Sequence, residues 1–524
     1  MVNLRDIATS SARGTLVLTI GRFASILTSA IGMILVARML SPEEYGLYAL
    51  SLVLPSAFML FNDWGINQGL VKYIAQYRSE EKNSKIIGLS ISGLLFKLLL
   101  GISLTALLFI LAGFLAVNFQ GRPELGGYIR LISILILFQT LRGAGFSILL
   151  GLEEMEARAI MDIIQGLVKG IVSPVLVWRG LGISGVLIGH LISYVASSIY
   201  GLLILPSFFS RYGYFESDNV EFKGNIFQLV SYGFPLFLGG FFGGAVNWFR
   251  GLLMSWYIAD VLIGNFSVAS RFTSLISVFT SSIGSTLFPT FSRFTFKEEE
   301  KKLKEAYKAS VSYSSIFVVP IVIFVFFFSE HAIRILFSDK YELAPLLLRI
   351  LLLPVLLVGF GSLSNINLLN SQGYTKTTLR ISVLRSLALA ISSAILVFYF
   401  GIIGYAVSLV LSSFISVFFS LFLLDKTHDI IPNLKHSLKV YMGSIFSVGT
   451  AALVSSFIEN EFKSLFLGGT VFLLLYFLIS PLIGILTLRD INILQTMFNE
   501  FPLFYPIVNF LLEIEEKLVN LTLN

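Results

Sequence analysis

Apolar stretches of about 20 residues recur along almost the whole chain, and they constrain its fold more than any other feature. A helix needs roughly 20 apolar residues to cross a bilayer core about 30 Å thick. Only 13% of the 524 residues are charged, whereas about 25% is usual in soluble proteins. The alternating segments of about 10 residues that form transmembrane barrels are absent from the sequence. We therefore predict an all-α, polytopic membrane helix bundle.

The apolar runs predict about fourteen transmembrane helices. They lie near residues 15–37, 46–62, 86–112, 127–150, 157–178, 183–207, 230–257, 262–290, 310–329, 344–369, 377–400, 402–424, 440–458 and 464–488. We group them into an N-lobe of six helices (1–215), a C-lobe of six (216–430), two further helices (431–489) and a cytoplasmic or interfacial tail (490–524). The longest loops are 211–224 and the charged segment 296–308, for which we expect a solvated or interface-lying helix.

The two predicted lobes carry an internal repeat. The segment from Leu181 matches the segment from Phe400, with Gly182 over Gly401 and three further glycine or serine pairs at a constant shift of 219. Two other landmarks fall at nearly the same shift, including Gly46 over Gly264. Six helices per repeat is an even number, so the halves should share one orientation and be related by an axis along the membrane normal.

The distribution of Lys and Arg predicts the orientation. With the N-terminus inside, the loops on the inner side hold more than twenty of these residues, and the outer loops hold only Arg38, Arg122, Arg179, Lys340 and Lys463. This asymmetry follows the positive-inside rule. We therefore expect a multi-pass protein of the plasma membrane with both termini in the cytoplasm.

A short charged segment that contains proline, "LSPEEYG", separates the first two apolar runs. Proline lacks an amide donor and disfavours helix at the preceding residue, so Ser41 and Pro42 should end the first helix. Glu43 and Glu44 suit the first turn of the next helix. Gly46 would allow a neighbour to approach closely. We interpret this segment as the end of one helix and the start of the next rather than as an active site.

The run "ARMLSPEEYGLYAL", followed by "FNDWGINQGLVKYIAQY" at residues 61–77, resembles the opening of the polysaccharide-biosynthesis (Wzx-type) flippases. Their superfamily (MOP) also holds lipid II flippases and MATE drug exporters. The resemblance covers nearly the whole chain. It implies transport of a polyprenyl-phosphate- or polyprenyl-diphosphate-linked oligosaccharide to the outer leaflet, by alternating opening of a cavity between two lobes.

Basic residues inside the predicted helices are the candidate substrate-binding groups. A basic side chain at mid-bilayer costs about 2.5–3.5 kcal/mol, so each should face a partner or a watery cavity. Few acids lie near them, and a surplus of positive charge suits a ligand that carries phosphate. Six of these bases are expected to line one central cationic cavity: Arg22, Lys97, Arg142, Lys169, Arg250 and Arg271. For Arg385, a cavity position and a structural position remain equally open.

Two interior acids could form a coupling-ion site, Asp63 and Asp162. For Asp63 we prefer a polar helix break, because Gly65 should bend the second helix nearby. No acid lies inside the eleventh and twelfth predicted helices, so a carboxylate ion site in the C-lobe is not expected. His190 is interpreted as a packing residue.

Enzyme signatures are missing from the sequence. There is no phosphate-binding loop motif, no cysteine and no metal-ligand spacing among the four histidines, so we expect no catalytic site, metal or cofactor. Coupling to an ion gradient or to the membrane potential stays open. We expect lipid-linked oligosaccharide and membrane lipid as partners, with glycan-assembly enzymes as further candidates. The alternative function is a MATE-like exporter of small molecules, which should instead line its cavity with acids and aromatic residues.

Overall fold

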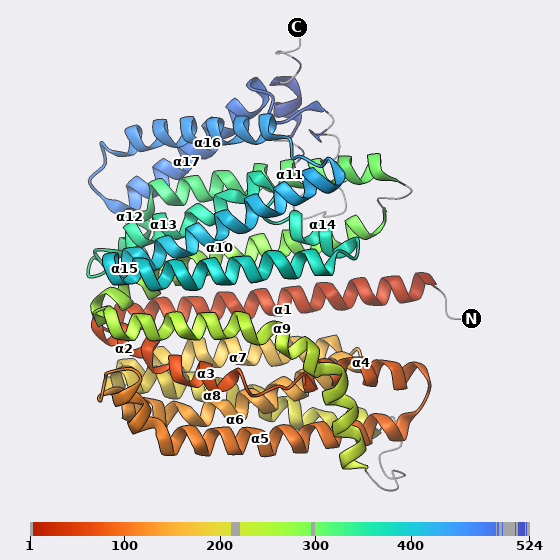
Figure 1. Ribbon diagram of the computed structural model, residues 1–524. Coiled ribbons are helices and arrows are strands. Elements are labelled where there is room, and N and C mark those ends of the chain that lie inside the picture. The colour runs from red at the N-terminus through yellow and green to blue at the C-terminus, as the bar shows by residue number, and fades with distance from the viewer. Residues whose placement is uncertain are drawn as a thin grey trace. The chain divides into compact units, whose positions relative to one another are not determined.

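The computed structural model is almost entirely helical, and Figure 1 shows the arrangement of its elements. It describes residues 4–210, 221–294, 299–488, 490–491, 495, 509, 512–518 and 520. Residues 211–220 of the expected 211–224 loop, the first residues of the 296–308 segment and most of the 490–524 tail lie outside the described residues. No strand occurs in the described part of the chain.

Among the described residues, nine helices are long and apolar enough to cross a membrane, or eleven when two bent pairs are counted as single spans. Two of the nine, at 155–209 and 375–428, each contain two of the predicted spans. Glycine contacts show that the chain folds back within both of them. A Cβ on Gly189 would lie 2.4 Å from the Ser173 hydroxyl, and one on Gly404 would lie 1.9 Å from the Leu396 carbonyl oxygen. The polytopic all-α prediction is confirmed, and the helix count is consistent with about fourteen.

The described chain divides into two compact units. The first holds residues up to 271 together with 393–405, and the second holds 272–392 and 406 onward. In the first unit, α1 packs along α7, α5 along α6, and α7 along α8. The helices of this unit are α1 (Leu4–Met39), α2 (Pro42–Ser51), α3 (Val53–Met59), α4 (Ile66–Ser79), α5 (Asn83–Asn118), α6 (Leu125–Gly151), α7 (Met155–Leu176), the π-turn η1 (Val177–Leu181), α8 (Gly182–Phe209) and α9 (Phe222–Tyr257).

In the second unit, α11 packs against α13 and α16, and α16 packs along α17. Helices α10 (Asp260–Ser292) and α15 (Thr375–His428) contribute residues to both units. The helices confined to the second unit are α11 (Glu300–Phe327), α12 (Ser329–Phe337), α13 (Ala344–Leu356), the 3₁₀ turn η3 (Leu357–Phe360), α14 (Asn365–Ser371), α16 (Leu434–Ser455) and α17 (Glu461–Leu482).

In the charged segment between the first two helices, α1 ends and a fully capped helix, α2, begins. Ser41 is the N-cap of α2, where its hydroxyl accepts from the Glu44 amide at 3.1 Å and its own amide donates to the Glu44 carboxylate at 2.8 Å. Pro42 occupies the first helical turn, where its missing donor costs nothing. This capping box satisfies two backbone donors that the new helix end leaves free. The stop-and-restart prediction is confirmed.

The repeat is visible in the backbone. Gly182 and Gly401 share the same unusual backbone conformation, with φ/ψ of 49°/−132° and 54°/−130°. Positive φ is strained for residues with a side chain, which explains glycine at both positions. A Cβ on Gly185 would lie 2.9 Å from the Leu176 carbonyl carbon, and Gly404 meets Leu396, its near-equivalent neighbour. The predicted shift of 219 therefore corresponds to one local structure made twice.

The second predicted helix, 46–62, ends at a break that is followed by a further helix. Helix α3 stops at Met59, and Trp64 and Gly65 adopt positive φ of 51° and 81° before α4 begins. The predicted bend at Gly65 is present. However, the segment after it is the helix α4 and not a loop, because Ile66, Leu70 and Ile74 are fully buried and provide a core face at helical spacing.

Two features of the second unit were not expected from the sequence. The short amphipathic helix α12 occupies the connection before α13. A further helix at 512–518 places Glu515 against α17, where the Ser480 hydroxyl donates to its carboxylate at 3.1 Å. Burial raises the pKa of Glu515 to about 7, so its carboxyl carries a proton far more readily near neutral pH than an exposed glutamate.

Candidate functional site

The buried charges of the first unit fall into three local groups. The first is built at the break after α3. Lys97 of α5 is completely buried, and its ammonium donates to the Asn62 carbonyl at 2.8 Å and lies 3.1 Å from the Asp63 carboxylate. Asp63 also accepts from the Asn67 amide at 3.0 Å, which holds the start of α4. Lys97 thus ties α5 to backbone that the broken helix leaves without partners.

The second group joins α6, α7 and α8. Arg142 forms an ion pair with Asp162, and its Nε donates to the Ser197 hydroxyl at 2.9 Å. Arg158 stacks on the ring of Phe146, 3.8 Å from its centroid, and lies within electrostatic reach of Asp162, Arg142 and Arg22. Arg22 itself is exposed on α1. This group therefore sets three arginines around one carboxylate, and its net charge is positive.

The third group is centred on Arg271 of α10. Its guanidinium interacts with the hydroxyls of Tyr45 and Tyr48 on α2 and lies within electrostatic reach of Lys169 and His190. The Tyr48 hydroxyl lies 3.4 Å from His190 Nδ1. Lys169 is 8% exposed. Among the described residues, no carboxylate lies within ion-pair distance of either base, so this group holds uncompensated positive charge.

Tyr194 of α8 connects the second and third groups. Its ring centroid lies 5.5 Å from that of His190 and 5.8 Å from the Arg142 guanidinium. The face of the Tyr194 ring can accept the Arg142 cation through its quadrupole. A polar path therefore runs through the first unit from Asp162 to Arg271.

Arg250 of α9 is separate from these groups. It is 3% exposed, donates to the Ser393 hydroxyl at 2.9 Å and to the Tyr405 carbonyl at 3.2 Å, and lies 3.9 Å from the Tyr405 ring centroid. These contacts fasten α9 to both arms of the α15 turn. The arrangement satisfies the guanidinium within the protein.

All six predicted bases lie in the first unit, but the structure places them in different settings. Lys97 and Arg142 each have a carboxylate partner, Arg250 is held by hydroxyl and carbonyl groups, and Lys169 and Arg271 share one group. The acids proposed for a coupling ion, Asp63 and Asp162, are each matched with a base. A cation bound there would compete with that base. No cluster of three or more metal-ligand side chains occurs in the part of the chain that the structure describes.

Sequence reasoning missed several members of the site. Tyr45, Tyr48 and Tyr194 are uncharged and were not candidates, and Arg158, at the start of the fifth predicted helix, was not among the selected bases. His190 was interpreted as a packing residue, yet it lies within electrostatic reach of both uncompensated bases. One signal could have found the tyrosines: Tyr45 and Tyr48 are three residues apart and therefore share a helix face.

Comparisons with known proteins place this geometry in a family. The model of the family described as "Polysaccharide biosynthesis protein" matches residues 11–295, more than half of the chain. This chain belongs to that family. The MatE family model also matches, over residues 235–396. The two matches support the predicted assignment to the MOP superfamily, and the predicted family is confirmed.

Individual relatives agree with this assignment. An uncharacterized membrane protein of Methanocaldococcus jannaschii is 26% identical over 88% of this chain and 92% of its own length. A probable low-salt glycan biosynthesis flippase of Haloferax volcanii, Agl15, is 22% identical over 55% of this chain and 59% of its own. Among solved structures, the lipid II flippase MurJ in an inward closed conformation superposes with a TM-score of 0.69 at 19% identity, covering 90% of this chain and 99% of MurJ. That likeness shows a shared fold.

Proposed function

We propose that this protein is a flippase that moves a polyprenyl-phosphate- or diphosphate-linked oligosaccharide from the inner to the outer leaflet of the plasma membrane by alternating access. The product would serve cell-surface polysaccharide or glycoprotein glycan assembly. The observation that carries this proposal is the group of partly buried Arg271 and buried Lys169, two bases without a carboxylate within ion-pair distance among the described residues.

A phosphate ligand explains why such charge is retained. A buried base without a partner is costly, whereas a phosphate supplies the missing charge and accepts several hydrogen bonds. Arg271, the hydroxyls of Tyr45 and Tyr48, and Lys169 together offer such donors. The positive group around Arg142 and Arg158 would attract the same headgroup along the polar path. Family membership and the flippase relatives support the same substrate class.

The experiment is complementation of a flippase-deficient strain with Arg271→Gln and Lys169→Gln. Loss of one charge-assisted phosphate contact costs about 1.5–3 kcal/mol, so export should fall roughly tenfold to hundredfold at equal membrane abundance. Arg271→Lys should recover part of it. The control is Arg179→Gln, an exposed base at the α7–α8 turn. Normal export by both Gln variants at normal abundance would refute the phosphate role.

A small-molecule exporter is the second candidate, because the MatE family model matches residues 235–396. In such an exporter, Arg271 and Lys169 would not contact the substrate. Cationic dyes are a typical substrate of this class of exporter. The same strains distinguish the two functions. Dye extrusion that depends on this protein, with no effect on glycan export, would favour the exporter.

A further inference from the structure

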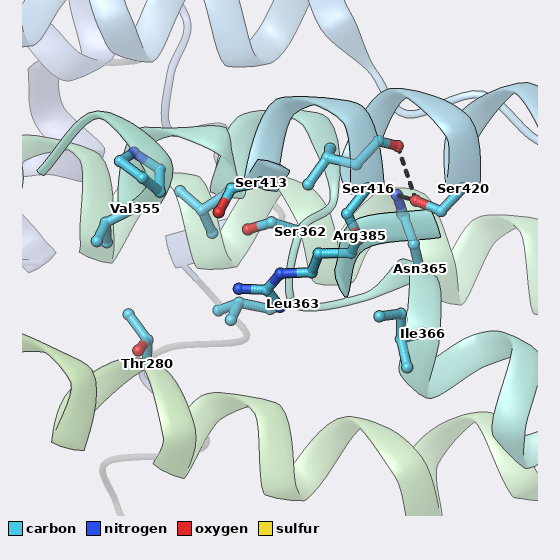
Figure 2. A pocket seen from close by; sticks show the side chains of 13 residues that line it. Thr280, Val355, Ser362, Leu363, Asn365, Ile366, Arg385, Ser413, Ser416 and Ser420 are labelled. Carbon is cyan, nitrogen blue, oxygen red and sulfur yellow. Dashed lines mark hydrogen bonds between the residues drawn. The ribbon is translucent and has the colours of Figure 1, made fainter. Parts of the chain in front are cut away.

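The second unit holds a partly open cavity with several polar lining residues. It has a volume of about 220 Å³ and is lined by residues of α10, of the broken segment from α13 to α14, and of both arms of α15. Figure 2 shows Arg385 reaching into its middle, between Ser362 and Leu363.

Arg385, an exposed residue on the first arm of α15, is the charged group of this cavity. Among the described residues it makes no ion pair or hydrogen bond, and no acidic side chain lines the cavity with it. Nearby hydroxyls come from Ser362 and from three serines on the second arm of α15, Ser413, Ser416 and Ser420. A lining with one cation, several hydroxyls and no carboxylate selects for a single negative charge, because guanidinium and hydroxyl groups can all donate to it.

The broken helix shapes the cavity. The 3₁₀ turn η3 ends at Phe360 and is followed by Gly361, whose φ of 80° only glycine adopts easily. Helix α14 then begins at Asn365. Asn365 is held rigidly, since its Oδ1 accepts from Tyr307 at 2.7 Å and its Nδ2 donates to Ser420 at 2.8 Å. This polar wall is therefore preorganised without a ligand.

The internal repeat allows the cavity to be compared with the equivalent positions of the first repeat. In the first repeat, Arg142 pairs with Asp162 and donates to Ser197. At the predicted shift of 219, Ser197 corresponds to Ser416, which is kept in the cavity lining. The two members of the ion pair, however, correspond to Gly361 and Ile381. The second repeat thus lacks the ion pair, and Arg385 enters from another position.

The size and lining of the cavity limit its occupant. A buried water needs roughly 10–15 Å³, so this space far exceeds what one water or one monatomic ion requires. It is also smaller than the 300–1,000 Å³ typical of drug-sized ligands. Pro354, Val358 and Val417 line it with apolar surface beside the hydroxyls. A ring with hydroxyl groups at its edge and C–H groups on its faces matches a lining that is partly hydroxyl and partly apolar.

We propose that the Arg385 cavity binds one monoanionic, polyhydroxylated ring of the kind found in sugar acids, with Arg385 on the carboxylate. The assignment rests on the proposed transport of a glycan, and it specifies an acidic sugar within that glycan. A free sugar acid has the same chemistry, so the experiment distinguishes the two sources.

The first measurement is calorimetric titration of the full chain in detergent with sodium glucuronate, beside glucose and sodium chloride at matched ionic strength. Glucuronate should bind, and Arg385→Gln should weaken its binding at least tenfold. Arg385→Lys should retain part of it and show that the site still folds. The matched control is Arg380→Gln, an exposed arginine five residues earlier on α15. Equal affinity in wild type and Arg385→Gln, or equal competition by chloride, would overturn the proposal.

The second measurement uses vesicles that contain the reconstituted protein and a lipid-linked glycan with or without one uronate. A loss in Arg385→Gln confined to the uronate-bearing lipid assigns the cavity to the glycan. Arg385-dependent glucuronate binding without that selectivity assigns it to the free acid. If neither lipid is moved by wild type while the titration still depends on Arg385, the transport proposal fails and the cavity assignment stands.

Discussion

At the scale of single residues, the sequence indicates which helices carry buried charge but not how each charge is satisfied. Lys97 and Arg250 were selected by the same rule, namely that a base inside an apolar helix needs a partner. Lys97 pairs with a carboxylate at a helix break, and Arg250 donates to a hydroxyl and a carbonyl of α15. Such partners are distant in sequence, so no local pattern could identify them.

The Lys97–Asp63 pair yields a prediction that separates a structural role from substrate binding. Removing one member of a buried ion pair leaves an uncompensated charge and typically costs about 3–5 kcal/mol. We therefore expect Lys97→Met and Asp63→Asn each to lower the thermal unfolding temperature in detergent. The double variant should recover much of that loss, because no charge remains unpaired.

Lys85→Met is the control, since Lys85 is an exposed base on the same helix. Export is measured in parallel. If the double variant restores stability without restoring export, Lys97 also contacts substrate. Additive losses in the double variant would contradict the pairing as the source of the effect.

At the scale of helices, the two repeats meet through glycine. A Cβ on Gly46 of α2 would lie 2.0 Å from the Asp260 carbonyl oxygen, and a Cβ on Gly264 of α10 would lie 1.9 Å from the Pro42 carbonyl oxygen. The shift of 218 that relates Gly46 to Gly264 also relates Pro42 to Asp260, so the contact is reciprocal. Arg122 reinforces it by pairing with Asp260 and donating to the Ile258 carbonyl at 2.7 Å.

Alanine at either glycine should therefore separate α2 from α10. Overpacking by one methyl group usually costs about 1–3 kcal/mol, and here both obstacles are backbone atoms that cannot rotate away. We expect Gly46→Ala and Gly264→Ala to lower the unfolding temperature by similar amounts. Gly127→Ala is the control, because a Cβ there meets nothing within 4 Å. Unchanged unfolding temperatures for Gly46→Ala and Gly264→Ala would show that the helices do not need this approach.

At the scale of the whole molecule, hydropathy and the repeat predicted the helical class and most helix positions, because the bilayer imposes one length on every span. They did not predict that α4 continues the broken second helix, or that the segment between α13 and α14 is broken. Local breaks arise where tertiary contacts replace the lost backbone partners, as Lys97 does for Asn62. The Arg385 cavity depends on such a break and was equally hidden from the sequence.

The orientation of the chain is the remaining whole-molecule prediction, and the lack of cysteine makes it directly testable. Single cysteines can be placed in exposed turns, with the cysteine-free parent as the background control. The positive-inside rule puts the α4–α5 turn inside, because it lies in a loop with Arg78, Lys82 and Lys85. It puts the α16–α17 turn outside, where the chain is acidic.

A membrane-impermeant maleimide should therefore label Glu459→Cys in intact cells and Lys82→Cys only after permeabilisation. Both side chains are exposed, so accessibility of the thiol does not depend on unfolding. An even number of crossings between the N-terminus and the α4–α5 turn then places the N-terminus in the cytoplasm. The reverse labelling pattern would invert every helix together, and it would make the Lys- and Arg-rich loops external, against the charge asymmetry from which the orientation was inferred.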